Sequence, residues 1–410
     1  MAIEKNPFDK IEQTLSNVVK LPEQIKEAAG SPTFEADEDG GVTVDFTEVN
    51  IEMEPEGEMK EWYGNIADDL DDERLAEIAE NVINNYTADK DSRAEWESMF
   101  ERGFDLLGLK IQDTSEPFEG ACTAVHPMLI ESAVKFQSKA IQEMFPANGP
   151  VKTQILGKVT PERELQSNRV KDFMNYQVTE QMPEYFDEFE RMLFHLPLIG
   201  SAFKKVYYDA NLKRPVSEFV PIDQFYVSYY ASNLNKADRY THVIYRSPVD
   251  LAKDMRTGIY DEIDLPEATY PSPTSLSEKM DTILGLSPTD NSDPQYTLLE
   301  QHCYLEIDEE YALPYIVTVE EQSRTVLSIR RNYKKEDKQQ QKISHFVHYR
   351  FVPGFGFYGF GLMHFLGNLT MTATAAMRSL VDAGQFANLP GGFKAKGVRL
   401  VGDNEPISPG

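Results

Sequence analysis

The sequence is poor in cysteine, and it has no long apolar run. Its 410 residues include two cysteines, Cys122 and Cys303, which lie far apart in the chain. Two such thiols make no disulfide framework, no CxxC pair is present, and this usage is typical of a reducing compartment. No apolar stretch reaches the roughly 18 residues that a membrane span needs, and the charged N-terminus lacks the apolar core of a signal peptide. We therefore expect no membrane partner.

Basic charge is also scarce. The chain has 40 Lys and Arg residues against 68 Asp and Glu residues, a formal net charge of −28. A protein that coats nucleic acid needs clustered Lys and Arg to neutralise phosphates, so this class is disfavoured. A protein past which nucleic acid slides stays open, because tight phosphate binding would be a handicap there.

The chain changes character along its length. Residues 1–60 are acidic with little apolar periodicity, so we predict a disordered arm, although the alternation at 42–46 leaves one short strand open. Helical periodicity dominates 70–200, and short alternating strands dominate 201–355. A stretch rich in Pro, Ser and Thr at 265–296 is interpreted as a mobile insertion with one short helical patch. The sequence therefore predicts an α+β fold.

A long helix predicted at 360–387 is almost uncharged. Between Gly359 and Asp382 its only formal charge is Arg378. Apolar residues cover nearly its whole circumference, so we expect it to be buried on all sides, either inside its own chain or among copies of it. The many aromatic residues of the chain favour extensive subunit interfaces. The packing positions that we predict are Leu362, Phe365, Leu369, Ala373, Ala376 and Leu380.

The segment before this helix matches G-x-G-x-x-G. It follows a predicted strand, and Asp382 lies about twenty residues further on, as in a dinucleotide-binding fingerprint. Bulky aromatic residues between the glycines would crowd a pyrophosphate, however, and no strand–helix–strand unit follows. We interpret the segment as a hinge that lets the helix start at a sharp angle, with a nucleotide-binding enzyme as the alternative. The hinge residues are Gly354, Gly356, Gly359 and Gly361.

No catalytic or metal-binding pattern stands out. The seven histidines are scattered, and His345 and His348 point to opposite faces of a predicted strand, so they cannot share a metal. Neither G-x-S-x-G nor H-E-x-x-H occurs. We therefore predict a protein that is not an enzyme and has no catalytic residues, no metal and no cofactor.

Two long stretches point to a family. One comprises PFEGACTAVHPMLIESAVKFQSKAIQEMFPANGPVKTQILG and then FMNYQVTEQMPEYFDEFERMLFHLPLIGSAFKKVYYD; the other is GFGFYGFGLMHFLGNLTMTATAAMRSLVDAGQFANLPGGFKAKGVRL. In this order they resemble the portal (head-to-tail connector) proteins of tailed bacteriophages, of the long podovirus type. The resemblance covers residues from about 115 to 408.

The resemblance implies a structural subunit of a ring, usually of twelve copies, at one capsid vertex of the virion and assembled in the host cytoplasm. Double-stranded DNA is packaged through the ring by the terminase motor and later ejected, and tail adaptors, capsid and scaffold proteins are further partners. Residues of about 70–355 would form the wing, 360–387 the first stem helix and 388–410 the start of a truncated clip. We thus expect the N-terminal part of a longer protein. Another virion protein, such as a tail adaptor, is a second alternative. Candidate contacts for DNA or an adaptor are Lys394, Lys396 and Arg399.

Overall fold

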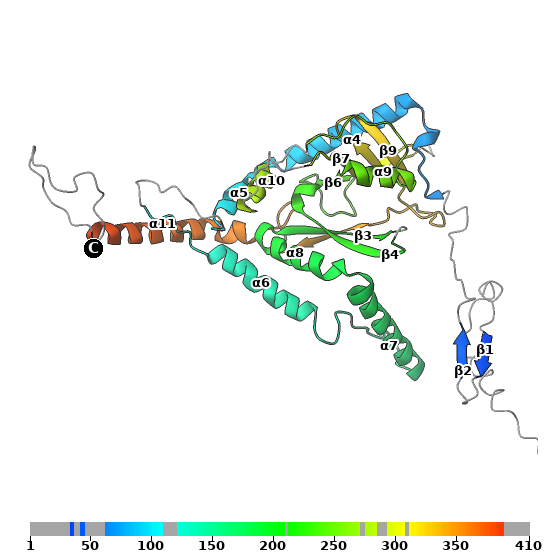
Figure 1. Ribbon diagram of the computed structural model, residues 1–410, viewed down its shortest axis with the longest axis horizontal. Helices are drawn as coiled ribbons and strands as arrows, with labels where there is room; N and C mark the ends of the chain where they lie inside the picture. Colours follow the sequence, from blue (N-terminus) through cyan, green and yellow to red (C-terminus); the bar gives the residue numbers. More distant parts are fainter. Residues whose placement is uncertain are drawn as a thin grey trace, which may run out of the picture. The chain divides into compact units, whose positions relative to one another are not determined.

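The computed structural model describes residues 33–36, 42–45, 62–109, 121–209, 212–270, 275–284, 293–307 and 311–388 (Figure 1). The chain divides into two compact units, residues 1–64 and 65–410. In the first unit, β1 (Thr33–Ala36) pairs antiparallel with β2 (Val42–Asp45). These residues lie within the predicted disordered arm and form a β-ladder instead, and β2 is the short strand that the sequence left open.

The second unit is built of helices and antiparallel sheets, which confirms the α+β class. Its N-terminal half is helical, as predicted. After a 3-10 turn (Ala67–Asp69) come α4 (Asp72–Ser92), α5 (Ala94–Asp105), α6 (Met128–Met144), α7 (Pro161–Tyr176), a π-helical turn (Gln177–Gln181) and α8 (Glu184–Ile199). Three helices follow later: α9 (Pro248–Arg256), α10 (Ser275–Leu284) and α11 (Leu362–Asn388).

Two antiparallel sheets make up the β-rich half. The smaller one has the order β10-β3-β4, with β3 (Ser201–Asp209), β4 (Arg214–Val220) and β10 (Phe346–Arg350). The larger one runs β5-β6-β7-β8-β9 in order. Its strands are β5 (Phe225–Val227), β6 (Tyr240–Arg246), β7 (Tyr296–Leu305), β8 (Leu313–Glu320) and β9 (Thr325–Arg331), and a 3-10 turn (Ile222–Gln224) precedes β5. The short strands predicted within 201–355 are confirmed at these positions.

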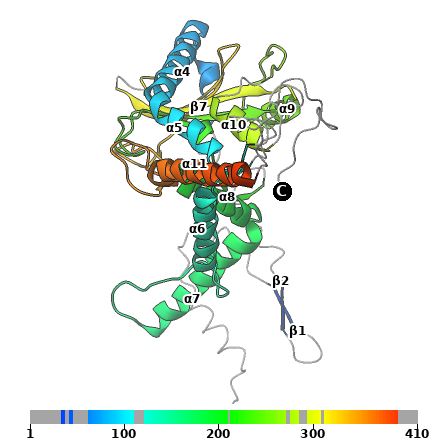
Figure 2. The same ribbon diagram turned by 90° about the vertical axis from the view of Figure 1, so that its left-hand side faces the viewer.

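A shared core joins the two sheets. The ring centroid of Phe225 in β5 lies 4.3 Å from that of Phe203 in β3 and 4.8 Å from that of Phe346 in β10. Helix α8 covers the smaller sheet, α6 packs on α8, and α4 packs along the larger sheet. The first half of α11 contacts α5, α6 and α8, and the helix runs outward from them (Figures 1 and 2). Helical and β-rich regions thus form one unit.

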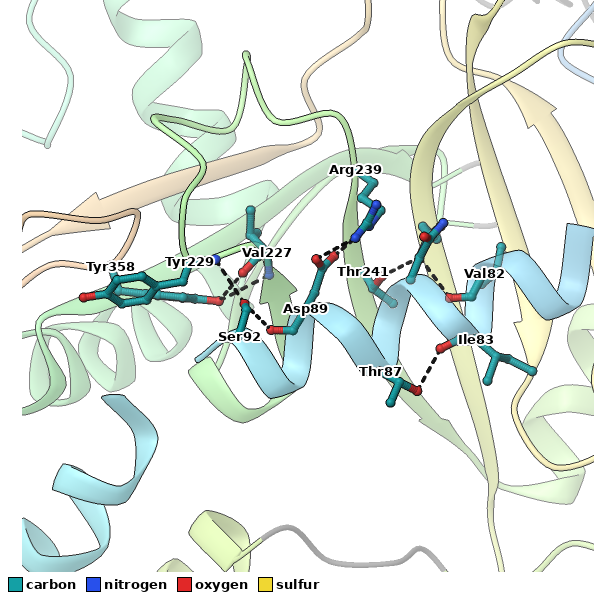
Figure 3. A network of polar contacts seen from close by, with 12 residues as sticks. Val82, Ile83, Thr87, Asp89, Ser92, Val227, Tyr229, Arg239, Thr241 and Tyr358 are labelled. Carbon is teal, nitrogen blue, oxygen red and sulfur yellow. Dashed lines mark hydrogen bonds and ion pairs between the residues drawn. The ribbon is translucent and has the colours of Figure 1, made fainter. Parts of the chain in front are cut away.

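Polar contacts fasten α4 to the larger sheet. The carboxylate of Asp89 accepts two hydrogen bonds from the guanidinium of Arg239, at 3.0 and 3.1 Å (Figure 3). The side-chain amide of Gln301 in β7 donates to the Val82 carbonyl at 3.2 Å and to the Thr241 hydroxyl at 2.9 Å. Because buried polar groups need partners, these bonds fix how closely α4 packs on the larger sheet and in which direction it runs across it.

The described part of the predicted insertion at 265–296 is packed against the unit. A bridge between Thr269 and Gln295 closes its base, and the predicted short helix is confirmed as α10. Met280 and Ile283 of α10 contact the main core, and the Lys279 ammonium lies 3.2 Å from the Asp105 carboxylate. Helix α10 therefore packs on the unit, since these apolar side chains gain stability by leaving water.

Candidate interface on helix α11

The turn before α11 is anchored in the core by Tyr358. Its hydroxyl accepts from the N–H of Val227 at 3.2 Å and donates to the carbonyl of the same residue at 3.1 Å (Figure 3). Arg93, fully buried between α4 and α5, donates to the Tyr358 hydroxyl at 3.3 Å, to the Phe225 carbonyl at 2.7 Å and to the Glu97 carboxylate at 3.3 Å. The guanidinium carbon also lies 3.8 Å from the Tyr226 ring centroid. A buried cation with these partners holds the turn in place.

The start of α11 presses against the end of α8. Gly200 ends α8 with φ +101, and its N–H donates to the Leu196 carbonyl at 2.8 Å, a typical left-handed glycine cap. A Cβ atom at Gly200 would overlap the backbone of residues 359–361, and one at Gly361 would overlap the Leu198 carbonyl. Only glycines permit this backbone contact, so α8 sets the direction in which α11 leaves the core.

The structure gives a different reason for the predicted hinge glycines. Among the described residues none of the four has positive φ. They are needed because the backbone is crowded: a Cβ at Gly354 would overlap the Tyr358 carbonyl, and one at Gly356 would lie 2.8 Å from a Tyr229 ring carbon and 2.9 Å from its carbonyl oxygen. The glycines make a tight joint by close approach. Gly359 and Gly361 are buried, and Gly354 and Gly356 are half-buried, with the space beside their Cα atoms filled by Tyr358 and Tyr229.

The backbone N–H groups just before α11 are likewise hydrogen-bonded to side chains of the same chain. The N–H of Gly361 donates to Nδ1 of His364 at 3.1 Å. The N–H of Gly359 donates to Oγ of Ser201 at 2.8 Å, and that hydroxyl lies 3.1 Å from Nε2 of His348. Ser201 is 1% exposed, and burial lowers the pKa of His348 to about 3. The pair therefore holds the turn from inside the protein. Across the described residues no group of His, Cys, Asp and Glu has the arrangement of a metal site.

One face of α11 is covered by its own chain. Its buried residues are Met363, Gly367, Thr370 and Thr374, which recur at helical spacing on the side that meets α5, α6 and α8. A Cβ at Gly103 of α5 would lie 2.6 Å from the Met363 sulfur, which shows how closely these helices approach. This face was not among the predicted packing positions.

Residues 121–126 bind along the same side of α11 as an extended strap. The guanidinium of Arg378 donates to the carbonyls of Ala124 at 2.8 Å and Thr123 at 2.9 Å. The N–H of Cys122 donates to the Asp382 carboxylate at 2.7 Å, and that of His126 donates to the Thr374 hydroxyl at 3.1 Å. Sequence reasoning missed these roles. The available signal was that Arg378 and Asp382 are the first charges of an otherwise uncharged helix.

The predicted packing positions lie mainly on the opposite side of the helix. Phe365, Leu369 and Leu380 are 53%, 54% and 76% exposed, and Ala376 is exposed as well. Leu362 and Ala373 are half-buried. These residues line up at spacings of three, four and seven, so they form one apolar ridge along the helix. Within the described part of the chain only the other face of α11 is covered, so the expected burial on all sides is not reached there.

The ridge continues onto the turn before the helix as a ladder of phenylalanines. The centroid of Phe360 lies 5.7 Å from that of Phe355 and 6.3 Å from that of Phe365. Phe355 is 99% exposed. We define the α11 ridge as Phe355, Phe360, Phe365, Leu369, Ala376 and Leu380. Contiguous exposed apolar surface of this kind marks interaction sites in folded proteins.

Some predicted features lie outside the described residues. These are Lys394, Lys396 and Arg399, together with the predicted clip beyond Asn388. Among the described helices, α11 included, none combines the length and the apolarity that crossing a bilayer requires. A scan against protein-family models and a search of curated proteins find no match to this chain.

Proposed function

We propose that this chain is a subunit of a bacteriophage portal, a structural ring at the capsid vertex through which double-stranded DNA is packaged and ejected. The ring is built of copies of the chain, usually twelve, and terminase, tail adaptors and capsid or scaffold proteins dock on it. The protein acts by assembly and carries out no chemistry of its own. Lys394, Lys396 and Arg399 are proposed contacts for DNA or an adaptor.

The α11 ridge is the observation that carries the proposal. Phe365, Leu369 and Leu380 are exposed, whereas the face that packs internally consists of Met363, Gly367, Thr370 and Thr374. Burying the exposed half of a Phe or Leu side chain contributes about 1 kcal/mol, so covering the whole ridge favours association strongly. Contacts between two different patches of identical subunits form rings when the rotation between neighbouring subunits closes. The resemblance of residues from about 115 to 408 to portal proteins, and the acidity of the chain, support the same function.

The test is the assembly state of the intact gene product. We expect closed rings with an axial hole in negative-stain electron microscopy, and labelled rings at a single capsid vertex in virions. In the double variant Leu369→Glu, Leu380→Glu the rings should be lost while the circular dichroism spectrum stays unchanged, because both side chains are exposed in the single chain. Val249→Glu on α9 is the matched control, since Val249 is 78% exposed and far from α11 in sequence.

Two results would overturn the proposal. The first is a wild-type protein that stays a monodisperse monomer. The second is a double variant that still forms rings, because the ridge would then have no part in assembly. Rings found on the tail and not at the vertex would instead favour a tail adaptor. The nucleotide-binding alternative has no supporting observation, since the glycines of residues 354–359 are packed against Tyr229, Tyr358 and Gly200.

A further inference from the structure

A buried cluster of ionisable residues lies where the two sheets meet. The ammonium of Lys205 in β3 lies 2.7 Å from the carboxylate of Glu300 in β7, and their side chains are only 15% and 12% exposed. The strand β3 belongs to the smaller sheet and β7 to the larger one. This ion pair therefore crosses from one sheet to the other, at a depth where solvent screens it little.

A chain of hydrogen bonds extends the pair. Nε2 of His302 lies 3.2 Å from the second carboxylate oxygen of Glu300, and its Nδ1 lies 3.3 Å from the side-chain nitrogen of Asn332. The side-chain oxygen of Asn332 lies 3.2 Å from Nε2 of His345, whose carbonyl accepts from the N–H of Val206 in β3 at 2.7 Å. The chain thus starts on β3, passes through the larger sheet and returns to β3.

This geometry requires that at least one of His302 and His345 is neutral. His302 donates from Nε2 to the carboxylate, and its Nδ1 accepts from the Asn332 amide. The amide oxygen then accepts from Nε2 of His345. If both histidines were charged, both rings would present N–H groups to Asn332, which has one acceptor oxygen only. At least one bond of the chain would then break inside the protein.

His242 adds a third imidazole without a hydrogen-bond partner for its buried Nδ1. It stands opposite Glu300 in the β6–β7 pairing, and its ring lies 5.5 Å from that of Phe346. The charged and titratable groups around the three histidines come from every neighbouring element: Lys205 and Tyr207 on β3, Tyr240 and Arg246 on β6, Glu300 on β7, Tyr260 in the loop after α9, and Lys342 before β10.

We propose that this cluster is a proton-operated latch between the two sheets: it holds them together while His242, His302 and His345 are neutral, and mild acid opens it. At neutral pH Lys205 and Glu300 balance each other. Each imidazole that gains a proton adds a positive charge beside Lys205, and only one carboxylate is available to compensate. Protonation therefore favours any state in which the sheets move apart and the rings reach water.

Burial accounts for the direction of the pH effect. It lowers the pKa of His242 to about 3 and of His345 to about 4, with Lys205 and His302 adding to the shift, and it also lowers the pKa of His302. Since the ordinary pKa is about 6.5, the closed state binds fewer protons, so its stability is full above that value and falls as the pH drops through it. At pH 5 this raises the equilibrium constant for opening by about 30-fold for each of His242 and His345.

Hydrogen exchange with mass spectrometry tests the latch in the wild-type protein. After correction for intrinsic exchange rates, peptides from β3 and β10 should lose protection by several hundred-fold between pH 7 and pH 5, while those from β8 and β9 keep theirs. In the variants His242→Asn and His345→Gln, the factor by which protection falls should each time be about 30-fold smaller than in the wild type. His195→Gln is the matched control. His195 is half-buried on α8, and burial lowers its pKa to about 4. Its ring lies 5.3 Å from that of Phe219 in β4 of the smaller sheet, so we expect it to stay covered when the sheets part.

Several outcomes would overturn the proposal. Equal protection of β3 and β10 at both pH values would do so without any variant. Protection that is lost in both sheets together would mean global unfolding and no latch. Variants that keep the full acid response, or a control that loses it, would show that these histidines are not the ones that respond.

Discussion

The close contact between the end of α8 and the start of α11 leads us to predict that substitution of Gly200 lowers the free energy of unfolding. The substitution Gly200→Ala adds one methyl group at a residue with φ +101, and that group overlaps the backbone of residues 359–361. The neighbouring atoms belong to main chain and not to a flexible side chain. The methyl group can therefore be accommodated only if α11 moves away from the end of α8.

Two costs add at this position. Placing an alanine in left-handed backbone costs about 1–2 kcal/mol. Overpacking a tight site costs about 1–3 kcal/mol more. We therefore expect Gly200→Ala to lower the free energy of unfolding by roughly 2–5 kcal/mol, a large part of the stability of an ordinary domain.

Two other glycines separate these costs in urea-unfolding experiments. Gly258 has φ +73 with no atom within 4 Å of a built Cβ, so Gly258→Ala should show the backbone cost alone. Gly384 lies inside α11 with equally open space, so Gly384→Ala should stabilise the protein by up to about 1 kcal/mol. If Gly200→Ala proved no more destabilising than Gly258→Ala, the reasoning on the joint would be refuted.

Three further predictions concern charged and titratable side chains. Arg93→Met should lower the free energy of unfolding by about 3–5 kcal/mol in urea titrations, because it leaves the buried Glu97 unpaired, whereas Arg74→Met at the 41% exposed pair with Glu77 should cost less than about 1 kcal/mol. Arg378→Gln should destabilise the protein by about 1–2 kcal/mol and speed hydrogen exchange at residues 121–126, and unchanged exchange there would argue against the strap. Burial lowers the pKa of His195 to about 4, so the neutral form stabilises the fold above pH 6.5 and this is lost as the pH falls. His195→Gln should therefore remove about 2 kcal/mol of the stability loss between pH 7 and pH 5, measured from urea midpoints.

Local pattern was enough to place most helices and strands. The cap at Ser247 illustrates why: its hydroxyl accepts from the N–H of Asp250 at 3.1 Å, and Pro248 takes the first helical position, so all the information lies within a few residues. The same holds for α6, which spans Met128–Met144 and is bounded in the sequence by Pro127 and Pro146.

Interactions between distant parts of the chain were not predictable in this way. The glycines before α11 were noticed as a motif, but the reason for them is close contact with residues far earlier in the chain: Tyr229 approaches Gly356, and Gly200 approaches Gly359 and Gly361. Arg93 was overlooked because its partners, Phe225 and Tyr358, come together only in the folded protein. The cluster of Lys205, Glu300 and the histidines was missed for the same reason, since a pairing of two sheets leaves no local signature.

The buried face of α11 could not be predicted from the sequence, and the physical reason is a different one. Hydrophobicity ranks Phe365, Leu369 and Leu380 first for burial, yet these three side chains are exposed. The chain buries Met363, Gly367, Thr370 and Thr374 instead. Small residues let the strap and α5 come close to the helix, and hydrogen bonds at Thr374, Arg378 and Asp382 then hold the strap. An exposed ridge gains nothing within one chain, while covering it gains about 1 kcal/mol for each large side chain. The surface that completes α11 therefore has to come from outside the residues that the structure describes, and a neighbouring copy provides it in the assembly that we propose.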